Sequence, residues 1–233
     1  MARASHDATP SLTTGLDGLM LLAVLAVLAT VVRAAEFTPI EANQGIAQKI
    51  FYLHAPAAWV AFLAFGLVAI SGALYLWLRD IRLDRFAESS AEVGVVFTTV
   101  VLITGPLWGK PVWGTWWTWD ARLTLTLFLW FVYVGYLVLR GALEDRAARA
   151  RYAAVLGILG ALLIPFIHLS VYLVHTLHPQ PIVLKPSRPS LPNSMLWTLL
   201  LAFVAFTLLY IAFVRQRYRL ASLRDAADAL EHE

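Results

Sequence analysis

Tryptophan is concentrated in one short part of the sequence, around GKPVWGTWWTWDARLT at residues 109–124. An interfacial aromatic belt would distribute its rings over the ends of all the membrane spans. A dense group of indoles instead offers large apolar faces with polar edges, which suits a flat hydrophobic ligand. The group consists of Trp108, Trp113, Trp116, Trp117 and Trp119.

Two charged residues, Asp120 and Arg122, follow this group. Asp120 stands where an N-cap of the next helix would stand, with its carboxylate accepting backbone N–H bonds. Arg122 falls in the first helical turn, where the helix dipole disfavours a cation. It therefore needs an anionic partner, which is either Asp120 or a carboxylate of a ligand.

Histidines supply the candidate metal ligands. His54 precedes the second apolar run. Three more histidines would share one face of a fifth helix and its exit, namely His168, His175 and His178. Along the helix axis, His168 would lie about 15 Å below His178. The sequence has no cysteine, so thiolate sites are excluded. A bare metal ion would require a third or fourth ligand, whereas two neutral imidazoles can hold a heme iron from opposite faces. Of the three histidines near the fifth helix, His178 is the plausible external ligand because it lies level with the surface.

The composition indicates a polytopic membrane protein: 60% of residues are hydrophobic, 14% are charged, and the mean hydropathy is +0.70. We expect an all-α bundle of six transmembrane helices, which forms a single domain over residues 1–215. This domain would include an external tryptophan-rich loop and a short interfacial helix before the second span. A tail would follow over residues 216–233. The predicted spans are about 16–34, 56–78, 91–107, 122–139, 153–176 and 194–214.

Basic residues predict the orientation of the bundle. Twelve of them fall on the side that holds both termini and loops 79–90 and 140–152, and six fall on the other side. This bias predicts cytoplasmic termini and places the tryptophan-rich loop, His54 and His178 at the periplasmic surface. The clusters flank apolar runs and the net charge is only +3, so nucleic-acid binding is not expected.

Three sequence motifs carry a resemblance to a known family. PVWGTWWTWDARLT (111–124), LHAPAAW (53–59) and TLHP (176–179) resemble the heme exporter protein C family of the cytochrome c maturation pathway (system I), one of the tryptophan-rich heme-handling membrane proteins. The resemblance implies that His54 and His178 are axial ligands of heme b, which is carried as cargo. It also implies a porphyrin cradle formed by Trp113, Trp116, Trp117, Trp119, Asp120 and Arg122. The segment SVYLVHTLHP departs from the family pattern and leaves His175 as an alternative to His178.

The resemblance further implies a non-enzymatic role in the bacterial inner membrane. Such a protein hands heme to a periplasmic heme chaperone (protein E) and works with ABC transporter subunits A and B and the small membrane protein D. Lys185 and Arg188 are further candidates, beside Arg122, to pair with heme propionates. Two alternatives stay open at this point: a transporter that moves heme through its own helix bundle, and a structural subunit whose tryptophans anchor a partner.

Overall fold

The computed structural model describes residues 17–174, 176–180, 182–183, 185 and 187–231. Within these residues the regular elements are helices, and six helical segments are long and apolar enough to cross a membrane. A helix satisfies its backbone hydrogen bonds internally, as the lipid interior requires. The prediction of an all-α, multi-pass membrane protein is therefore confirmed.

The helices are, in chain order, α1 (Gly18–Val32), α2 (Phe51–Leu78), α3 (Ile81–Trp113), α4 (Ala121–Ala142), α5 (Arg146–Ala161), α6 (Leu163–Leu173) and α7 (Asn193–Glu231). A π-helical turn, Arg33–Phe37, extends α1, and α5 and α6 together make the fifth span. The short helix expected before the second span is the 3-10 turn Ile46–Ile50, which continues directly into α2.

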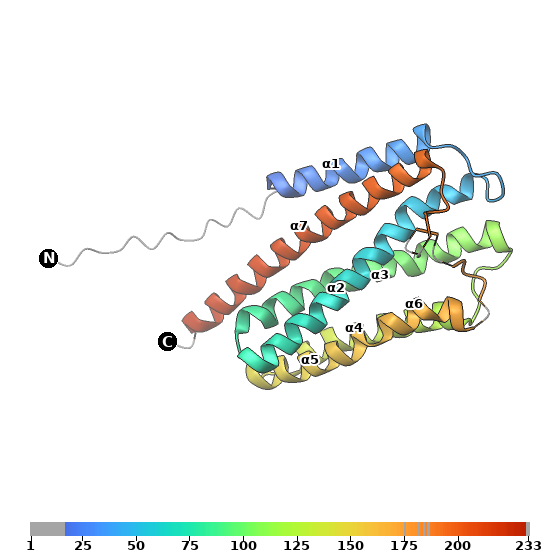
Figure 1. Ribbon diagram of the computed structural model, residues 1–233. Coiled ribbons are helices and arrows are strands. Elements are labelled where there is room, and N and C mark those ends of the chain that lie inside the picture. Colours follow the sequence, from blue (N-terminus) through green and yellow to red (C-terminus); the bar gives the residue numbers. More distant parts are fainter. Residues whose placement is uncertain (1–16, 175, 181, 184, 186, 232–233) are drawn as a thin grey trace.

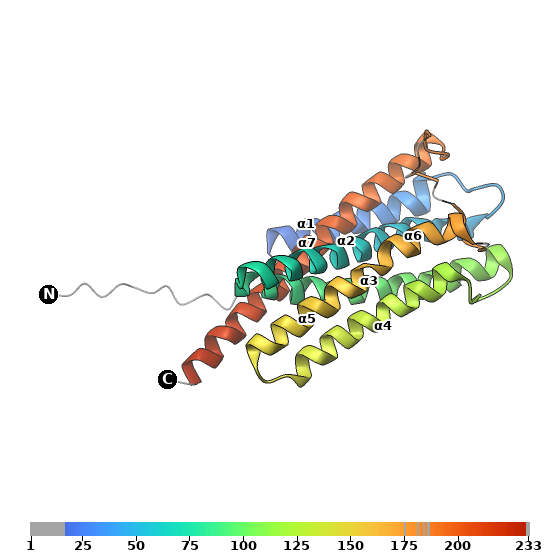
Figure 2. The same ribbon diagram turned by 60° about the horizontal axis from the view of Figure 1, so that its bottom comes forward.

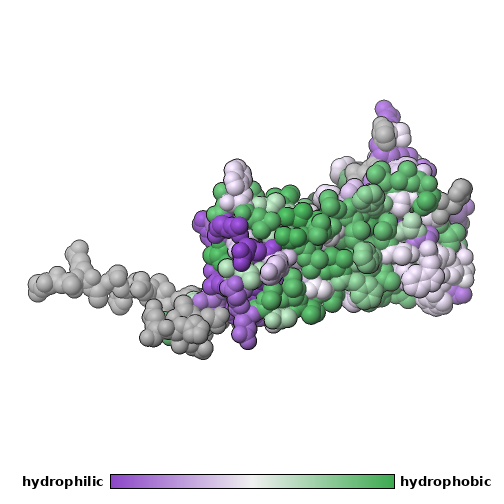
Figure 3. Space-filling model, turned by 90° about the horizontal axis from the view of Figure 1, so that it is seen from below, coloured by the Kyte–Doolittle hydropathy of each residue, from purple (hydrophilic) through white to green (hydrophobic). Residues whose placement is uncertain are grey.

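The spans form one bundle with α2 and α3 in the middle (Figure 1). On one side α1 packs against α7, and on the other α4 packs against α5 and α6 (Figure 1; Figure 2). One end of the bundle carries residues 114–120 and the chain after α6, and is called the tryptophan end. The opposite end carries the α2–α3 and α4–α5 connections and is called the arginine end. Hydrophobic side chains cover the middle of the bundle between the two ends (Figure 3).

Aspartate residues begin four of the helices. The carboxylates of Asp17, Asp80, Asp120 and Asp145 accept hydrogen bonds of 2.9 to 3.2 Å from backbone N–H groups in the first turns of α1, α3, α4 and α5. These N–H groups have no partner within a helix, so the caps stabilise each helix start. The N-cap role expected for Asp120 is confirmed.

Glycines allow α2 to approach its neighbours closely. A Cβ atom on Gly94 of α3 would lie 2.6 Å from the ring of Phe65, and one on Gly157 of α5 would lie 2.8 Å from Val68. The ring of Phe65 also stacks on that of Tyr133 in α4, with centroids 3.6 Å apart. Small residues of this kind let helix backbones pack tightly inside a membrane. The centre of the bundle is consequently filled by side chains.

The fifth span is broken between α5 and α6. Pro165 has no N–H to donate to the carbonyl of Ala161, and its ring crowds that carbonyl. The helix accordingly ends at Ala161 and resumes at Leu163. The interruption is confined to Leu162, whose backbone stays in the right-handed helical region (φ −62°, ψ −19°).

The end of the fifth span differs from the prediction. The helix was expected over residues 153–176, with His168 and His178 on one face, but α6 ends at Leu173 and the next residue is extended (φ −136°, ψ 155°). His178 therefore lies in a loop, and the shared helical face is wrong. His175 lies outside the described residues.

A buried ion-pair cluster holds the arginine end together. Arg140 of α4 is 5% exposed, and its Nη1 lies 2.6 Å from Oδ1 of Asp84 on α3. Its Nη2 lies 2.9 Å from Oε2 of Glu88, one turn further along α3. Two carboxylates thus surround one buried guanidinium, and the cluster joins α3 to α4.

The segment after residue 215 continues α7 without a break as far as Glu231. A tail was expected over residues 216–233, and its described part is helical. Asp225 pairs with Arg85 of α3 and Arg146 of α5, so this segment packs onto the arginine end.

Candidate functional site

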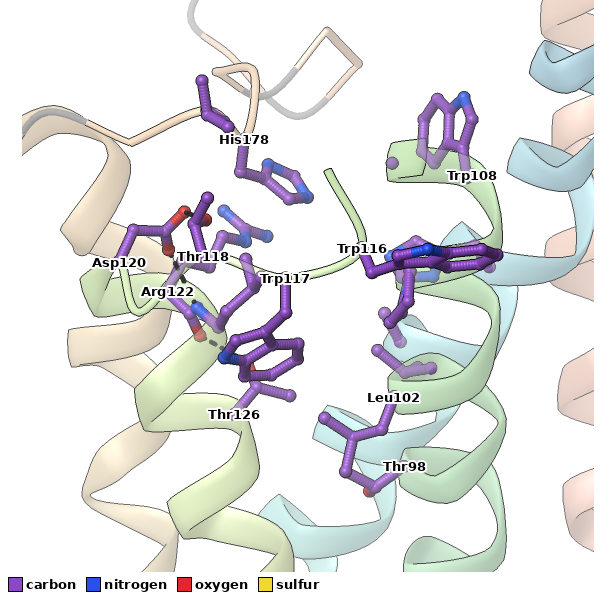
Figure 4. Close-up of a pocket in the computed structure, with 18 of the residues that line it drawn as sticks. Thr98, Leu102, Trp108, Trp116, Trp117, Thr118, Asp120, Arg122, Thr126 and His178 are labelled. Carbon is purple, nitrogen blue, oxygen red and sulfur yellow. Dashed lines mark hydrogen bonds between the residues drawn. The ribbon is translucent and has the colours of Figure 1, made fainter. Parts of the chain in front are cut away.

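One pocket opens at the tryptophan end of the bundle (Figure 4). Its space is about 940 Å³, part of it open to solvent. Side chains of α2, α3 and α4 form its walls, and the loop over residues 115–120 and the chain after α6 complete it. Apolar and aromatic side chains dominate the lining. The concave, mostly apolar and aromatic lining suits a flat organic ligand.

His54 enters the pocket from the first turn of α2. Its Nδ1 lies 2.9 Å from Oγ1 of Thr104 on α3. The ring of Trp108 stands edge-on to the imidazole, with centroids 5.8 Å apart. Among the described residues, Nε2 of His54 has no hydrogen-bond partner, so this atom can act as a metal ligand.

His178 enters the same pocket from the loop after α6 (Figure 4). Its Nδ1 lies 2.9 Å from the carbonyl oxygen of Pro179. A carbonyl can only accept, so Nδ1 carries the proton and Nε2 keeps its lone pair. The pKa of His178 is lowered from 6.5 to about 3. The larger cause is the removal of the ring from water, and the second is the positive charge of nearby Arg122. The hydrogen bond to Pro179 acts in the opposite direction. The imidazole is therefore neutral at physiological pH, as metal ligation requires.

We predict that His178 stays neutral in the folded protein when the pH falls from about 8 to about 5. The pKa of His178 is lower in the folded than in the unfolded chain. The contribution of this histidine to the free energy of unfolding is therefore complete above pH 6.5 and decreases as the pH falls toward 3. NMR of histidine-labelled protein in detergent, with the signal assigned by His178→Gln, measures this directly. A titration midpoint near 6.5 would contradict the burial of the ring.

The tryptophan loop starts where α3 ends. Gly114 adopts a left-handed conformation (φ 76°), and its N–H donates to the carbonyl of Lys110 at 3.0 Å, which closes the helix. At the other end of the loop, the Asp120 carboxylate accepts from Oγ1 of Thr118 at 3.0 Å and from N of Leu123 at 3.1 Å. Both oxygens of Asp120 thus fix the loop onto α4.

Four tryptophans line the pocket, namely Trp108, Trp113, Trp116 and Trp117. The rings of Trp108 and Trp113 lie 5.9 Å apart between centroids. Trp119, which was expected to belong to the same cradle, does not line the pocket: it is 77% exposed and stands edge-on to Trp117 at 5.8 Å. The described pocket therefore contains three of the four tryptophans expected there, and Trp108 in addition.

Two buried polar groups of the pocket lack a hydrogen-bond partner among the described residues: Nη1 of Arg122 and Nε1 of Trp117. Arg122 also forms no ion pair with Asp120 there, although the sequence left that pairing open. Buried donors are nearly always paired, because an unpaired one costs about 1–3 kcal/mol. Acceptor groups of a bound ligand could satisfy these donors.

Other candidates from the sequence lie outside the pocket. His168 of α6 packs near Tyr172, with ring centroids 6.4 Å apart. Lys185 donates to Ser190, and neither Lys185 nor Arg188 lines the pocket. No group of three or more His, Cys, Asp or Glu residues that could hold a metal ion occurs in the described part of the chain. The described donors thus suit a metal that brings its own equatorial ligands better than a bare ion.

Two residues beside the site, Thr104 and Gln44, were not identified from the sequence, whereas Trp108 was named there as part of the aromatic group. Trp108 borders His54 and donates from Nε1 to Oε1 of Gln44 at 3.0 Å, and Thr104 contacts His54 directly. Trp108 belongs to the aromatic cluster, so its type and position were a usable signal. Thr104 and Gln44 gave none, because they meet the site only after the helices pack.

Comparison with known proteins gives consistent results. The family model described as "Heme exporter protein C" matches residues 5–232. The chain is 39% identical over 191 residues to heme exporter protein C of Haemophilus influenzae, covering 82% of this chain and 78% of that protein. It is 37% identical over 209 residues to the protein of the same name from Bradyrhizobium diazoefficiens, covering 90% and 80% respectively. With the Escherichia coli K12 protein of that name, identity is 37% over 164 residues, covering 70% and 67%.

Proposed function

The chain belongs to the heme exporter protein C family, and we propose that it binds heme b as cargo at the periplasmic face of the bacterial inner membrane. It then presents this heme to a periplasmic heme chaperone during the biogenesis of c-type cytochromes. One observation carries the proposal. The imidazole of His54 on α2 and that of His178 in the loop after α6 line the same aromatic pocket. Among the described residues, neither Nε2 atom has a hydrogen-bond partner.

The described residues fit heme in three respects. His54 and His178 can supply the two axial nitrogens that a heme iron takes up. Trp113 and Trp117 belong to an aromatic lining that accommodates the flat porphyrin. Arg122 provides a buried, unpaired guanidinium nitrogen that can bind a propionate carboxylate, and Nε1 of Trp117 can donate to the same or a neighbouring acceptor.

The mechanism follows from what these residues do. His54 and His178 hold the iron, the tryptophans exclude water from the porphyrin faces, and Arg122 orients the propionate side. Part of the pocket is open to solvent, so an edge of the bound heme would be accessible to a partner protein. Because this function needs binding and release only, we propose a presenting protein and not an enzyme.

Orientation and partners are part of the proposal. The excess of arginine at the end that holds the α2–α3 and α4–α5 connections supports a cytoplasmic arginine end, which puts the pocket in the periplasm. Membership of the family supports an assembly with ABC transporter subunits A and B, the small membrane protein D and the chaperone, protein E.

Passage of heme through the bundle itself receives no support from the described residues. The pocket lining reaches Thr98 and Leu129 and ends there. Below this level, Phe65, Tyr133 and Tyr136 fill the space as fully buried side chains. The described structure therefore favours presentation at one surface over a continuous path.

The test is heme binding by the full chain purified in detergent. We expect about one heme per chain with a six-coordinate, low-spin absorption spectrum, and transfer of that heme to the soluble domain of the chaperone. Trp117→Ala should weaken heme binding by about tenfold or more, whereas Trp119→Ala, which removes an exposed indole of the same loop, should change it little.

The outcomes separate the parts of the proposal. A preparation that never binds stoichiometric heme contradicts it and favours a structural subunit. Binding without transfer to the chaperone contradicts the hand-off alone. Equal effects of Trp117→Ala and Trp119→Ala would show that the described pocket is not the heme site.

A further inference from the structure

We infer that Thr104 is a positioning residue for His54, which holds the imidazole in the one tautomer that leaves Nε2 free for iron. The inference rests on the proposed ligation by His54. It concerns a side chain of α3 outside the tryptophan motif and outside the pocket lining.

The hydrogen bonds of Thr104 assign the direction of its contact with His54. A hydroxyl has one proton to donate. In Thr104 this proton points to the carbonyl of Val100, 2.7 Å from Oγ1 and one turn back along α3. The oxygen is then left as the acceptor for Nδ1 of His54 at 2.9 Å. Nδ1 therefore carries the proton, and Nε2 carries the lone pair.

The surroundings of the ring hold it in place once this bond is made. Trp108 stands edge-on to the imidazole on one side. Gly105, next to Thr104, has no side chain, and a Cβ there would lie only 3.5 Å from Cε1 of His54. That distance is an ordinary contact, so the backbone of Gly105 lies directly beside the ring. Thr104 itself is only 6% exposed, so water competes little for its oxygen. The hydroxyl is thus the polar contact that sets both tautomer and ring direction.

His178 uses a different acceptor for the same purpose. Its Nδ1 bonds to the main-chain carbonyl of Pro179, which no side-chain substitution removes. Acceptors of this kind make a metal-binding histidine more basic, and their loss typically weakens metal binding about 10- to 100-fold. Of the two acceptors, Thr104 is therefore the one that mutation can test.

The experiment compares Thr104→Val, Thr104→Ser and Thr30→Val in the full-length protein in detergent. Valine keeps the shape of threonine and removes the hydroxyl, whereas serine keeps the hydroxyl. Thr30 of α1 is the matched control, because it is buried, does not line the pocket, and donates to the carbonyl four residues back (Ala26) at 2.8 Å.

We expect Thr104→Val to weaken hemin binding about 10- to 100-fold, and Thr104→Ser and Thr30→Val to bind as the unmodified protein does. Two further readouts distinguish positioning from a structural effect. The midpoint potential of the bound heme should rise in Thr104→Val, because a less basic imidazole stabilises ferric iron less. ¹⁵N NMR of the heme-free protein should show His54 protonated at Nδ1, and a mixture of tautomers in Thr104→Val.

Each outcome supports or overturns a defined statement. If His54→Ala loses heme while Thr104→Val keeps wild-type affinity and potential, the role of Thr104 is wrong and the ligation stands. If Thr30→Val weakens binding as much as Thr104→Val, the effect comes from the loss of any buried helical hydroxyl, and the positioning role is again wrong. If His54→Ala keeps heme with an unchanged spectrum, the proposed ligation itself fails.

Discussion

Replacing both His54 and His178 with alanine is expected to leave the purified protein without stoichiometric heme. Each substitution removes one of the two Nε2 atoms that face the pocket. Changes to outer partners of a ligating histidine already weaken metal binding about 10- to 100-fold, so loss of both ligands should cost at least about 100-fold. Heme per chain and the position of the Soret band measure the effect.

The control for this pair is His168→Ala. The same side chain is removed from α6, but His168 packs near Tyr172 and does not line the pocket. We expect this variant to keep its heme content and spectrum. A double variant of His54 and His178 that retained full occupancy with an unchanged Soret band would contradict the ligation.

Replacing Arg140 with alanine is expected to lower the free energy of unfolding by about 3–5 kcal/mol. The substitution would leave Asp84 buried without its partner and Glu88 without its closest cation. Removing one member of a buried ion pair is far more harmful than never having built the pair, because the remaining charges stay in a low-dielectric environment. Denaturant titration of the protein in mild detergent measures the change.

A matched control exists at the same end of the bundle. Arg82 also pairs with an aspartate, Asp80, but its side chain is 74% exposed. Arg82→Ala is therefore expected to leave the free energy of unfolding close to that of the unmodified protein. Equal losses for Arg140→Ala and Arg82→Ala would contradict a structural role for the buried cluster.

The six spans could be predicted because their lengths and hydrophobicity are properties of contiguous sequence. Their ends were less accessible: α2 starts before Pro56, α3 extends through Trp113, and α7 continues to Glu231. Caps and ion pairs, rather than burial in lipid, stabilise the helical conformation of the polar residues at these ends. A hydropathy pattern therefore does not predict where these helices begin and end. The break at Pro165 was predictable, since it depends on one residue.

The place of His178 could not be derived from periodicity. The apolar sequence through residue 174 continues a helical pattern, yet α6 stops at Leu173 and the chain turns so that His178 meets His54. Only tertiary contacts specify that turn. The resemblance to a family pointed to His178, which lines the pocket, whereas the argument from a shared helical face does not hold.

The content of the aromatic site was predicted better than its geometry. A loop has no repeat that tells which indoles face inward, so Trp119, now exposed, could not be separated from Trp117. Asp120 could be assigned from its position before a helix. The contact between His54 and Thr104 depends on the packing of α2 against α3, which no local pattern encodes.

The most direct test of the account is the low-temperature EPR spectrum of the ferric, heme-loaded protein. We predict a low-spin signal typical of two axial imidazoles. His54→Ala and His178→Ala should each convert it to a high-spin signal, which added imidazole restores to low spin. A low-spin signal that persists unchanged in either variant would mean that another group holds the iron, and would contradict the ligation by His54 and His178.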